Sequence, residues 1–384
     1  MGSLRKYLGL GALLVAAAWS GAASAGEAGE AAEPPAPRIQ VAILLDTSGS
    51  MGGLIEQAKT QLWKIVNEFI FAEKGGRKPQ LEVALYSYGM GSEGDGGFMQ
   101  RLLPLTTDLD KVSEKLFALR TSGSAEYCGW VIQRATRELE WSVSAGDLKV
   151  ICIAGNEAFT QGKVDYREAC KEAASKGIVV NTIHCGNEAE GISGKWKDGA
   201  LLADGTYSFI DQNRAVVHVN APQDAKIAEL GEALNKTYVP FGAAGADAAA
   251  RQVAQDANAS KSSMGSSVQR AVTKSSGYYV NANWDLVDAV QNKQVKLAEV
   301  KEADLPENMR KMDAREREAY VGSQLNERQR LQKEINTLNV ERQKYVDAET
   351  KKQAEAKGEK TLDAAMSETL RAQAAKREFQ FGSK

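Results

Sequence analysis

Hydrophobic positions between residues 39 and 235 follow two alternating patterns. Continuous apolar runs predict strands that are buried on both faces, and apolar residues three or four positions apart predict amphipathic helices. The predicted strands cover residues 39–45, 81–88, 98–103, 150–154, 178–183 and 206–210. The predicted helices cover residues 54–71, 109–119, 130–139, 166–175 and 224–235. This alternation predicts a doubly wound α/β fold, in which helices cover both faces of a mostly parallel sheet.

The first 25 residues have the pattern of a secretory signal peptide. Arg5 and Lys6 precede an apolar run over residues 8–19, and Ala23-Ser24-Ala25 supplies the small residues of a cleavage site. We therefore predict cleavage after Ala25 and a periplasmic or secreted protein. No later stretch is long and apolar enough to predict a membrane span. Residues 26–38 are rich in Ala, Glu and Pro, which predicts a linker.

The pattern changes after residue 242, where we place the end of an α/β domain over residues 39–242. Residues 243–284 are rich in Ala, Ser, Gly and Gln, and they predict a low-complexity linker with room for one helix. Residues 285–384 have a helical and charged pattern, with a short heptad-like seam at Leu331, Ile335, Leu338 and Tyr345. We predict a partly coiled-coil tail, and a protein that is monomeric or self-associates weakly through this tail.

Composition excludes several classes of function. The 48 basic and 50 acidic residues are balanced, so the overall charge gives no reason to bind nucleic acid. His184 and His218 are the only histidines, which restricts any histidine-dependent catalysis to these two positions. Four cysteines in 384 residues are too few for a disulfide-dense scaffold.

The most informative segment is Asp46-Thr47-Ser48-Gly49-Ser50-Met51, directly after the first predicted strand. Sites in open α/β sheets form beyond the carboxyl ends of the strands. Asp46, Ser48 and Ser50 bring three hard oxygen donors into one loop, which suits the octahedral preference of Mg²⁺. The positive end of the following helix favours anionic ligands at the same place. The alternative is that Ser48 and Ser50 only cap this helix.

This segment and the α/β alternation over residues 39–242 resemble von Willebrand factor type A (VWA) domains with their metal-ion-dependent adhesion site (MIDAS). The resemblance implies that Asp46, Ser48 and Ser50 are ligands of Mg²⁺, or of Mn²⁺ or Ca²⁺. In that family a Thr from a second loop and an Asp from a third loop complete the site. The ion is then presented to an acidic side chain of a partner protein. The whole chain looks like an exported bacterial protein of this class.

The second loop departs from the family pattern. Thr121 or Ser124 can supply the hydroxyl there, and Glu126 can supply a carboxylate instead. We therefore predict a metal site made of Asp46, Ser48, Ser50, Ser124 and Glu126.

The third loop also departs from the pattern. Gly155 stands where the resemblance implies an Asp, which leaves the site one acid short. Asn156 and Glu157 are the candidates to compensate for it.

The cysteines leave more than one arrangement open. We favour a Cys170–Cys185 disulfide, because export permits disulfides and both residues are predicted near one edge of the sheet. Free buried thiols are the main alternative. A zinc site from Cys128, Cys170, His184 and Cys185 would need four elements to converge, and the chain has no CxxC pair.

Motifs for nucleotide binding are incomplete. Residues 53–60 nearly spell a phosphate-binding loop, but Ala58 occupies a glycine position. Residues 89–94 match a dinucleotide fingerprint, but a predicted strand follows them where a helix is required. We therefore expect no nucleotide.

We predict that the chain is not an enzyme. Our interpretation is an exported, divalent-metal-dependent interaction module that binds a protein partner in the cell envelope. One alternative is a structural coiled-coil adaptor with a degenerate metal site. A second alternative is an enzyme that uses Cys185 and His184.

Overall fold

A computed structural model describes residues 35–69, 72–90, 99–213, 218–354 and 362–381. The predicted signal peptide and most of the predicted linker over residues 26–38 lie outside the described residues. Residues 36–384 belong to one folded unit. Among the described helices, none combines the length and the apolar character needed to cross a membrane.

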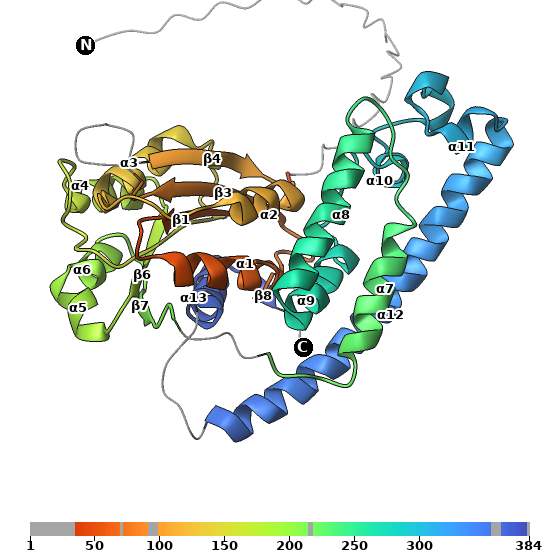
Figure 1. Ribbon diagram of the computed structural model, residues 1–384. Coiled ribbons are helices and arrows are strands. Elements are labelled where there is room, and N and C mark those ends of the chain that lie inside the picture. The colour runs from red at the N-terminus through yellow and green to blue at the C-terminus, as the bar shows by residue number, and fades with distance from the viewer. Residues whose placement is uncertain (1–34, 70–71, 91–98, 214–217, 355–361, 382–384) are drawn as a thin grey trace, which may run out of the picture. The chain divides into compact units, whose positions relative to one another are not determined.

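The central sheet has the strand order β4-β3-β1-β5-β6-β7 (Figure 1). Strand β4 runs antiparallel to β3, and the other neighbours pair in parallel. The strands are β1 (Arg38–Asp46), β3 (Gln80–Tyr88), β4 (Met99–Thr106), β5 (Leu148–Gly155), β6 (Val179–Cys185) and β7 (Tyr207–Ile210). Each overlaps a predicted strand, so the expectation of a mostly parallel, doubly wound sheet is confirmed.

Two apolar layers form because successive side chains of a strand point to opposite faces of the sheet. In β1, Ala42 and Leu44 lie in one buried cluster, and Val41 and Leu45 lie in the other. The first face is covered by α3 (Cys128–Glu138), α4 (Tyr166–Ser175), α5 (Glu188–Ser193) and α6 (Trp196–Leu201). The second face is covered by α1 (Gly52–Asn67), α2 (Leu109–Ala118) and α13 (Leu362–Lys376).

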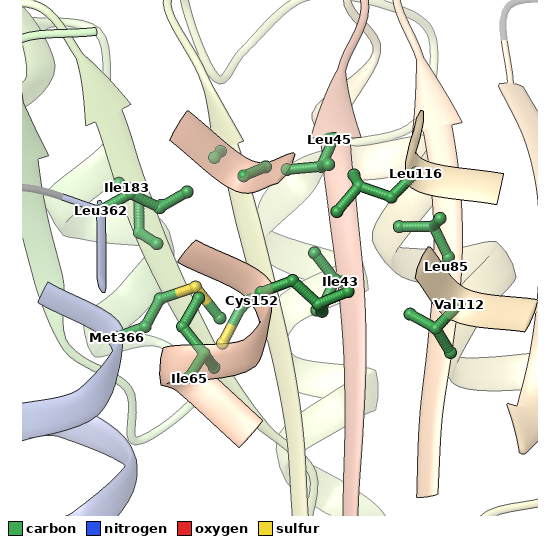
Figure 2. Close-up of a pocket in the computed structure, with 13 residues that line it drawn as sticks. Ile43, Leu45, Ile65, Leu85, Val112, Leu116, Cys152, Ile183, Leu362 and Met366 are labelled. Atoms are coloured by element: carbon green, nitrogen blue, oxygen red, sulfur yellow. The ribbon is translucent and has the colours of Figure 1, made fainter. Parts of the chain in front are cut away.

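The helix that completes the second face comes from the C-terminal part of the chain. Helix α13 packs against α1 and against strands β5, β6 and β7, and Leu362 and Met366 reach into the core (Figure 2). The small cavity drawn there has a volume of about 20 Å³ and only apolar side chains around it. It is close to the size of one water molecule, so it is a packing defect of the core.

Helix α7 (Asp224–Asn235) has the predicted bounds but a different place from the one expected. We expected it to close the α/β layer, and it packs mainly against α9 (Met264–Ser275) and α12 (Ala314–Ala354).

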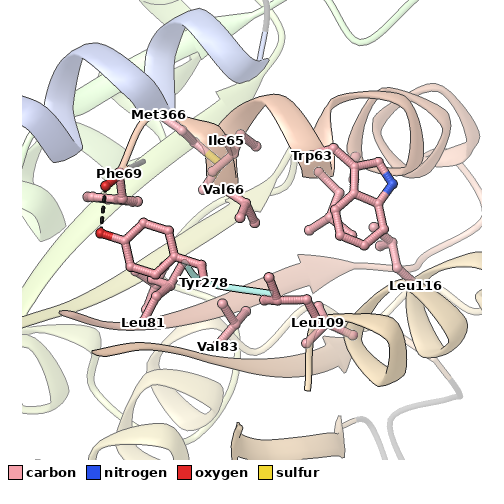
Figure 3. Close-up of a cluster of buried hydrophobic side chains, with 14 of the residues drawn as sticks. Trp63, Ile65, Val66, Phe69, Leu81, Val83, Leu109, Leu116, Tyr278 and Met366 are labelled. Atoms are coloured by element: carbon pink, nitrogen blue, oxygen red, sulfur yellow. Dashed lines mark hydrogen bonds between the residues drawn. The ribbon is translucent and has the colours of Figure 1, made fainter. Parts of the chain in front are cut away.

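The predicted low-complexity linker over residues 243–284 is wrong. Helices α8 (Gly245–Ser262) and α9 occupy most of it, and α10 (Leu286–Gln291) follows. Helix α9 packs on α1, and α8 packs on α2. Beyond α9, the hydroxyl of Tyr278 donates a hydrogen bond to the carbonyl oxygen of Phe69 at 2.6 Å (Figure 3). Residues 39–242 therefore share their core with the segment that follows them.

A buried ionic cluster holds α8 and α9 in place. Arg270 of α9 donates to Asp110 of α2 at 2.7 Å and also to Asp256 of α8. The ammonium group of Lys274 donates to Asp256 at 2.8 Å, and the hydroxyl of Tyr279 donates to Asp110 at 2.5 Å. Polar side chains thus occupy buried positions of α8 and α9. These helices therefore lack the apolar pattern by which a core helix is predicted from sequence.

The predicted seam of helix α12 packs against other parts of the same chain. Leu331 and Ile335 are buried in the main core, and Leu338 packs against it. Tyr345 is 39% exposed. The seam therefore docks α12 on neighbouring helices of the same chain, where we had predicted a coiled coil.

The guanidinium group of Arg328 anchors α12 to the rest of the fold. One of its terminal nitrogens donates to Asp285 and Asp288, at 2.6 Å in each case. Its other nitrogens donate to the hydroxyl and the carbonyl oxygen of Thr237, at 3.1 Å and 2.6 Å. The group also lies 4.1 Å from the centre of the Tyr238 ring. Its side chain is 3% exposed.

The remaining elements are short. They are β2 (Ala72–Glu73), β8 (Gln380–Phe381), η1 (Leu297–Glu299), η2 (Glu302–Asp304) and α11 (Glu307–Arg310). Strands β2 and β8 form an antiparallel pair, which joins residues from the two ends of the folded unit.

Candidate metal centre

The first loop of the candidate site follows β1 and is held by backbone contacts. Both the backbone N–H and the hydroxyl of Thr47 donate to the carbonyl oxygen of Tyr88 at 2.8 Å. The N–H of Ser48 donates to Asp46 Oδ1 at 2.7 Å, which fixes the carboxyl group at the strand end. Helix α1 begins just beyond, with Met51 at its N-cap and no side-chain cap bond. Capping therefore does not account for Ser48 and Ser50.

The second loop lies along the first. The N–H of Ser122 donates to the carbonyl oxygen of Thr47 at 2.8 Å, and the N–H of Gly49 donates to that of Gly123 at 3.0 Å. This pairing brings Glu126 to the site with only 2% of its surface exposed. Ser124 lies in the same loop, and its side chain is exposed.

Asp46 and Glu126 form a buried pair of carboxyl groups. Burial raises the pKa of Asp46 to about 9, and the negative charge of Glu126 adds to the effect. The Oδ2 atom of Asp46 is buried without a hydrogen-bond donor, and neither carboxyl group has an ion-pair partner among the described residues. Two buried acids in contact are stabilised either by a shared proton or by a cation.

The third loop explains why the expected Asp is absent. A side chain at Gly155 would place its Cβ atom 2.5 Å from the hydroxyl oxygen of Tyr88 and 3.1 Å from Asp46 Oδ2. That hydroxyl donates to the carbonyl oxygen of Ala154 at 2.8 Å, so it is fixed. The third loop therefore has no room for an acid at this position, and the buried carboxyl group nearest to Asp46 is that of Glu126 in the second loop.

Asn156 and Glu157 take different parts in this loop. The hydroxyl of Ser50 donates to Asn156 Oδ1 at 3.4 Å, which adds an amide oxygen to the site. The backbone N–H of Glu157 donates to Glu126 Oε2 at 3.2 Å, while its own side chain is exposed beside Gln161. Of the two candidates, Asn156 is the one whose side chain joins the site.

The donors gathered at this edge of the sheet are all oxygens. Ser48 Oγ and Ser50 Oγ lie 3.3 Å apart, and the two carboxyl groups and the Asn156 amide come from the three loops described above. Hard oxygen ligands suit Mg²⁺, Mn²⁺ or Ca²⁺. The described residues hold no cluster of three or more His, Cys, Asp or Glu placed to bind a metal. Hydroxyl and amide groups would therefore have to complete the coordination.

The predicted Cys170–Cys185 disulfide is wrong. All four cysteines are free and buried. Cys170 belongs to the apolar cluster on one face of the sheet, and Cys185 belongs to the cluster on the other face. The sheet itself separates the two sulfur atoms, which also removes the zinc site that would have used both.

His184 and Cys185 do not form an activated pair. They are consecutive residues of β6, so their side chains point to opposite faces of the sheet. Burial raises the pKa of the Cys185 thiol, which keeps it protonated. Burial also lowers the pKa of His184, whose two ring nitrogens have no hydrogen-bond partner among the described residues.

The structure does not support nucleotide binding at either of the two incomplete motifs. Residues 53–60 lie inside α1, so they form no phosphate-binding loop. Residues 91–94 of the fingerprint-like segment lie outside the described residues.

The fold and a family model define the class of one part of this chain. Residues 40–191 match the family model of the von Willebrand factor type A domain, and this part of the chain is a VWA domain. Such domains are commonly protein-interaction or adhesion modules. None of the curated proteins compared with the chain matches it.

Solved structures similar to the chain include three with VWA-type features. BatB from Bacteroides thetaiotaomicron is 20% identical, with 45% of this chain and 90% of that chain covered and a TM-score of 0.35. The SpRpn10 VWA domain is 19% identical, with 47% and 100% covered and a TM-score of 0.35. Proximal thread matrix protein 1 from the mussel byssus, with a zinc-occupied MIDAS motif, is 13% identical, with 45% and 42% covered and a TM-score of 0.35.

Proposed function

We propose that this chain is an exported interaction module that holds a divalent metal, Mg²⁺ in the first instance, and presents it to an acidic group of a protein partner. Asp46, Ser48, Ser50 and Glu126 would hold the metal, and Asn156 would support it. Ser124 is exposed in the second loop and stays a candidate ligand. The metal would supply a positive charge to which a carboxylate of the partner binds.

One observation carries the proposal: Asp46 and Glu126 are buried against one another without a cationic side chain. Such a pair is costly unless a proton or a metal compensates for it. Hydroxyl groups of Ser48 and Ser50 adjoin the pair, and they add donors of the type that a hard cation uses.

Isothermal titration calorimetry with the chain from residue 26 onward tests the metal site. We expect one site for Mg²⁺ or Mn²⁺, and loss of binding in Asp46→Ala and Glu126→Gln. The matched control is Glu157→Gln, which removes a neighbouring carboxylate whose side chain is exposed and bonded to Gln161. Equal affinity in Glu126→Gln and the control would refute the ligand assignment.

A pull-down from a cell-envelope extract tests the interaction. A protein partner should be retained in Mg²⁺ and released by a chelator, and Asp46→Ala should retain none. If the chain binds metal but retains no partner that a chelator releases, the proposed adhesion role is wrong. Absence of both would favour the alternative, a structural scaffold with a degenerate metal site.

The assembly state follows from the packing of α12. Leu331 and Ile335 are already buried within the chain, so the tail has no free seam to join two copies. We therefore propose that the protein is a monomer. Light scattering over a concentration series checks this expectation. A tight dimer would contradict it.

A further inference from the structure

A pocket with both polar and apolar walls lies at the end of the sheet opposite the candidate metal centre. Its volume is about 680 Å³, within the range of about 300–1,000 Å³ that is typical of small-molecule sites. Its walls include Ala36 before β1, Gln80 at the start of β3, and Asp108 at the start of α2. Strand β1 has nine residues, so roughly 26 Å separate the pocket from Asp46.

Carboxamide side chains dominate the lining on the side of the helical segment. Asn281, Asn283, Asn292 and Gln294 all contribute to it. Each carboxamide offers both hydrogen-bond donors and an acceptor. Lys78 and Asp108 also line the pocket, and Asp108 is paired with Lys111 at 3.4 Å. The carboxamides therefore favour a ligand that is polar and offers both donors and acceptors.

Asn281 presents a donor that the described residues leave unused. The residue is 6% exposed. Its Oδ1 atom accepts from Trp284 Nε1 at 3.1 Å, and its backbone N–H donates to Asp288 at 2.8 Å, so the side chain is fixed. The Nδ2 atom is buried without a hydrogen-bond partner within the described part of the chain. A buried donor without an acceptor is unfavourable, and a ligand oxygen would satisfy it.

Apolar surface adjoins these polar groups. Val280 is 46% exposed, and Tyr278 contributes to the same wall. A sugar ring combines hydroxyl groups, which need both donors and acceptors, with an apolar face of C–H groups. Carboxamides beside apolar side chains match both properties. We propose that this pocket binds a short neutral carbohydrate.

Calorimetric titration of the chain from residue 26 onward with maltotriose, cellotriose and chitotriose tests the proposal. We expect saturable one-site binding of at least one of them. Asn283→Ala should weaken it several-fold, and Asn281→Asp should weaken it about tenfold because it removes the Nδ2 donor. The matched control is Asn326→Ala, an exposed asparagine on α12 that does not line the pocket. Binding should persist in a chelator and in Asp46→Ala, which separates this site from the metal centre.

Three results would overturn the proposal. The first is that none of the trisaccharides binds at millimolar concentration. The second is that Asn283→Ala binds as well as Asn326→Ala; both changes are at exposed positions, so this comparison stands even where Asn281→Asp fails to fold. The third is tighter binding of a neutral blocked tetrapeptide of Gly and Ser in the same pocket, which would make it a peptide site.

Discussion

Replacement of Arg328 by Met should destabilise the protein strongly. The guanidinium group joins α12 to Asp285, Asp288 and the segment around Thr237, and it is nearly inaccessible to water. Removal of one partner from a buried ion pair costs about 3–5 kcal/mol, because the other charge is left uncompensated. Asp285 keeps two backbone donors, from Val239 and Asp288, at 2.6 Å and 3.0 Å. We therefore expect the lower part of that range, about 3 kcal/mol.

Urea unfolding followed by circular dichroism measures this change as a shift in the midpoint at constant slope. The control is Arg330→Met on the same helix. Arg330 bonds only to the exposed Glu327 and Glu334 among the described residues, so its replacement should have little effect. In the Arg328→Met background, Asp288→Asn should recover part of the lost stability, because it removes one of the two stranded charges.

Two outcomes would refute this reasoning. Equal destabilisation by Arg328→Met and Arg330→Met would mean that burial of the ion cluster is irrelevant. A loss below about 1 kcal/mol for Arg328→Met would mean that α12 is not anchored through this group.

Three other predictions follow from the same structure. Gly155→Asp should weaken metal binding in calorimetry rather than strengthen it, because the new Cβ atom would lie 2.5 Å from the hydroxyl oxygen of Tyr88; tighter binding would show that this loop is free to move. Burial and the charge of Asp285 raise the pKa of Asp288 from 3.8 to about 6. The protonated form is favoured in the folded state, so wild-type stability relative to Asp288→Asn should fall by about 2 kcal/mol as pH rises from 4 to 6; parallel pH profiles would contradict it. The four buried thiols should react with a thiol reagent only after unfolding in denaturant, and fewer than four reactive thiols in the unfolded, unreduced protein would reveal a disulfide.

The sheet and the first loop could be predicted from sequence because their signals are local. A buried strand is a continuous apolar run, and Asp46, Ser48 and Ser50 follow it within five positions. The position of Glu126 depends on how a second loop pairs with the first, through backbone bonds that the sequence does not display. Gly155 could be identified as a departure, but the clash that excludes a side chain there involves Tyr88 from a different strand.

Helices α8 and α9 were missed for a different physical reason. Helix α9 buries Arg270 and Lys274, and their partners Asp110 and Asp256 come from other helices. A search for apolar periodicity scores such positions as surface. Only the three-dimensional pairing of the charges shows that they belong to the interior.

The antiparallel pair of β2 and β8 has a consequence for how the chain acquires its structure. It joins Ala72 to Phe381, and the nearby α13 supplies Met366 and Leu370 to the core under the sheet. During synthesis part of this apolar face therefore stays open until α13 has left the ribosome. Contacts between such distant positions slow folding, because a long loop must close before they form. This delay would leave part of the core without its cover until α13 docks on the sheet.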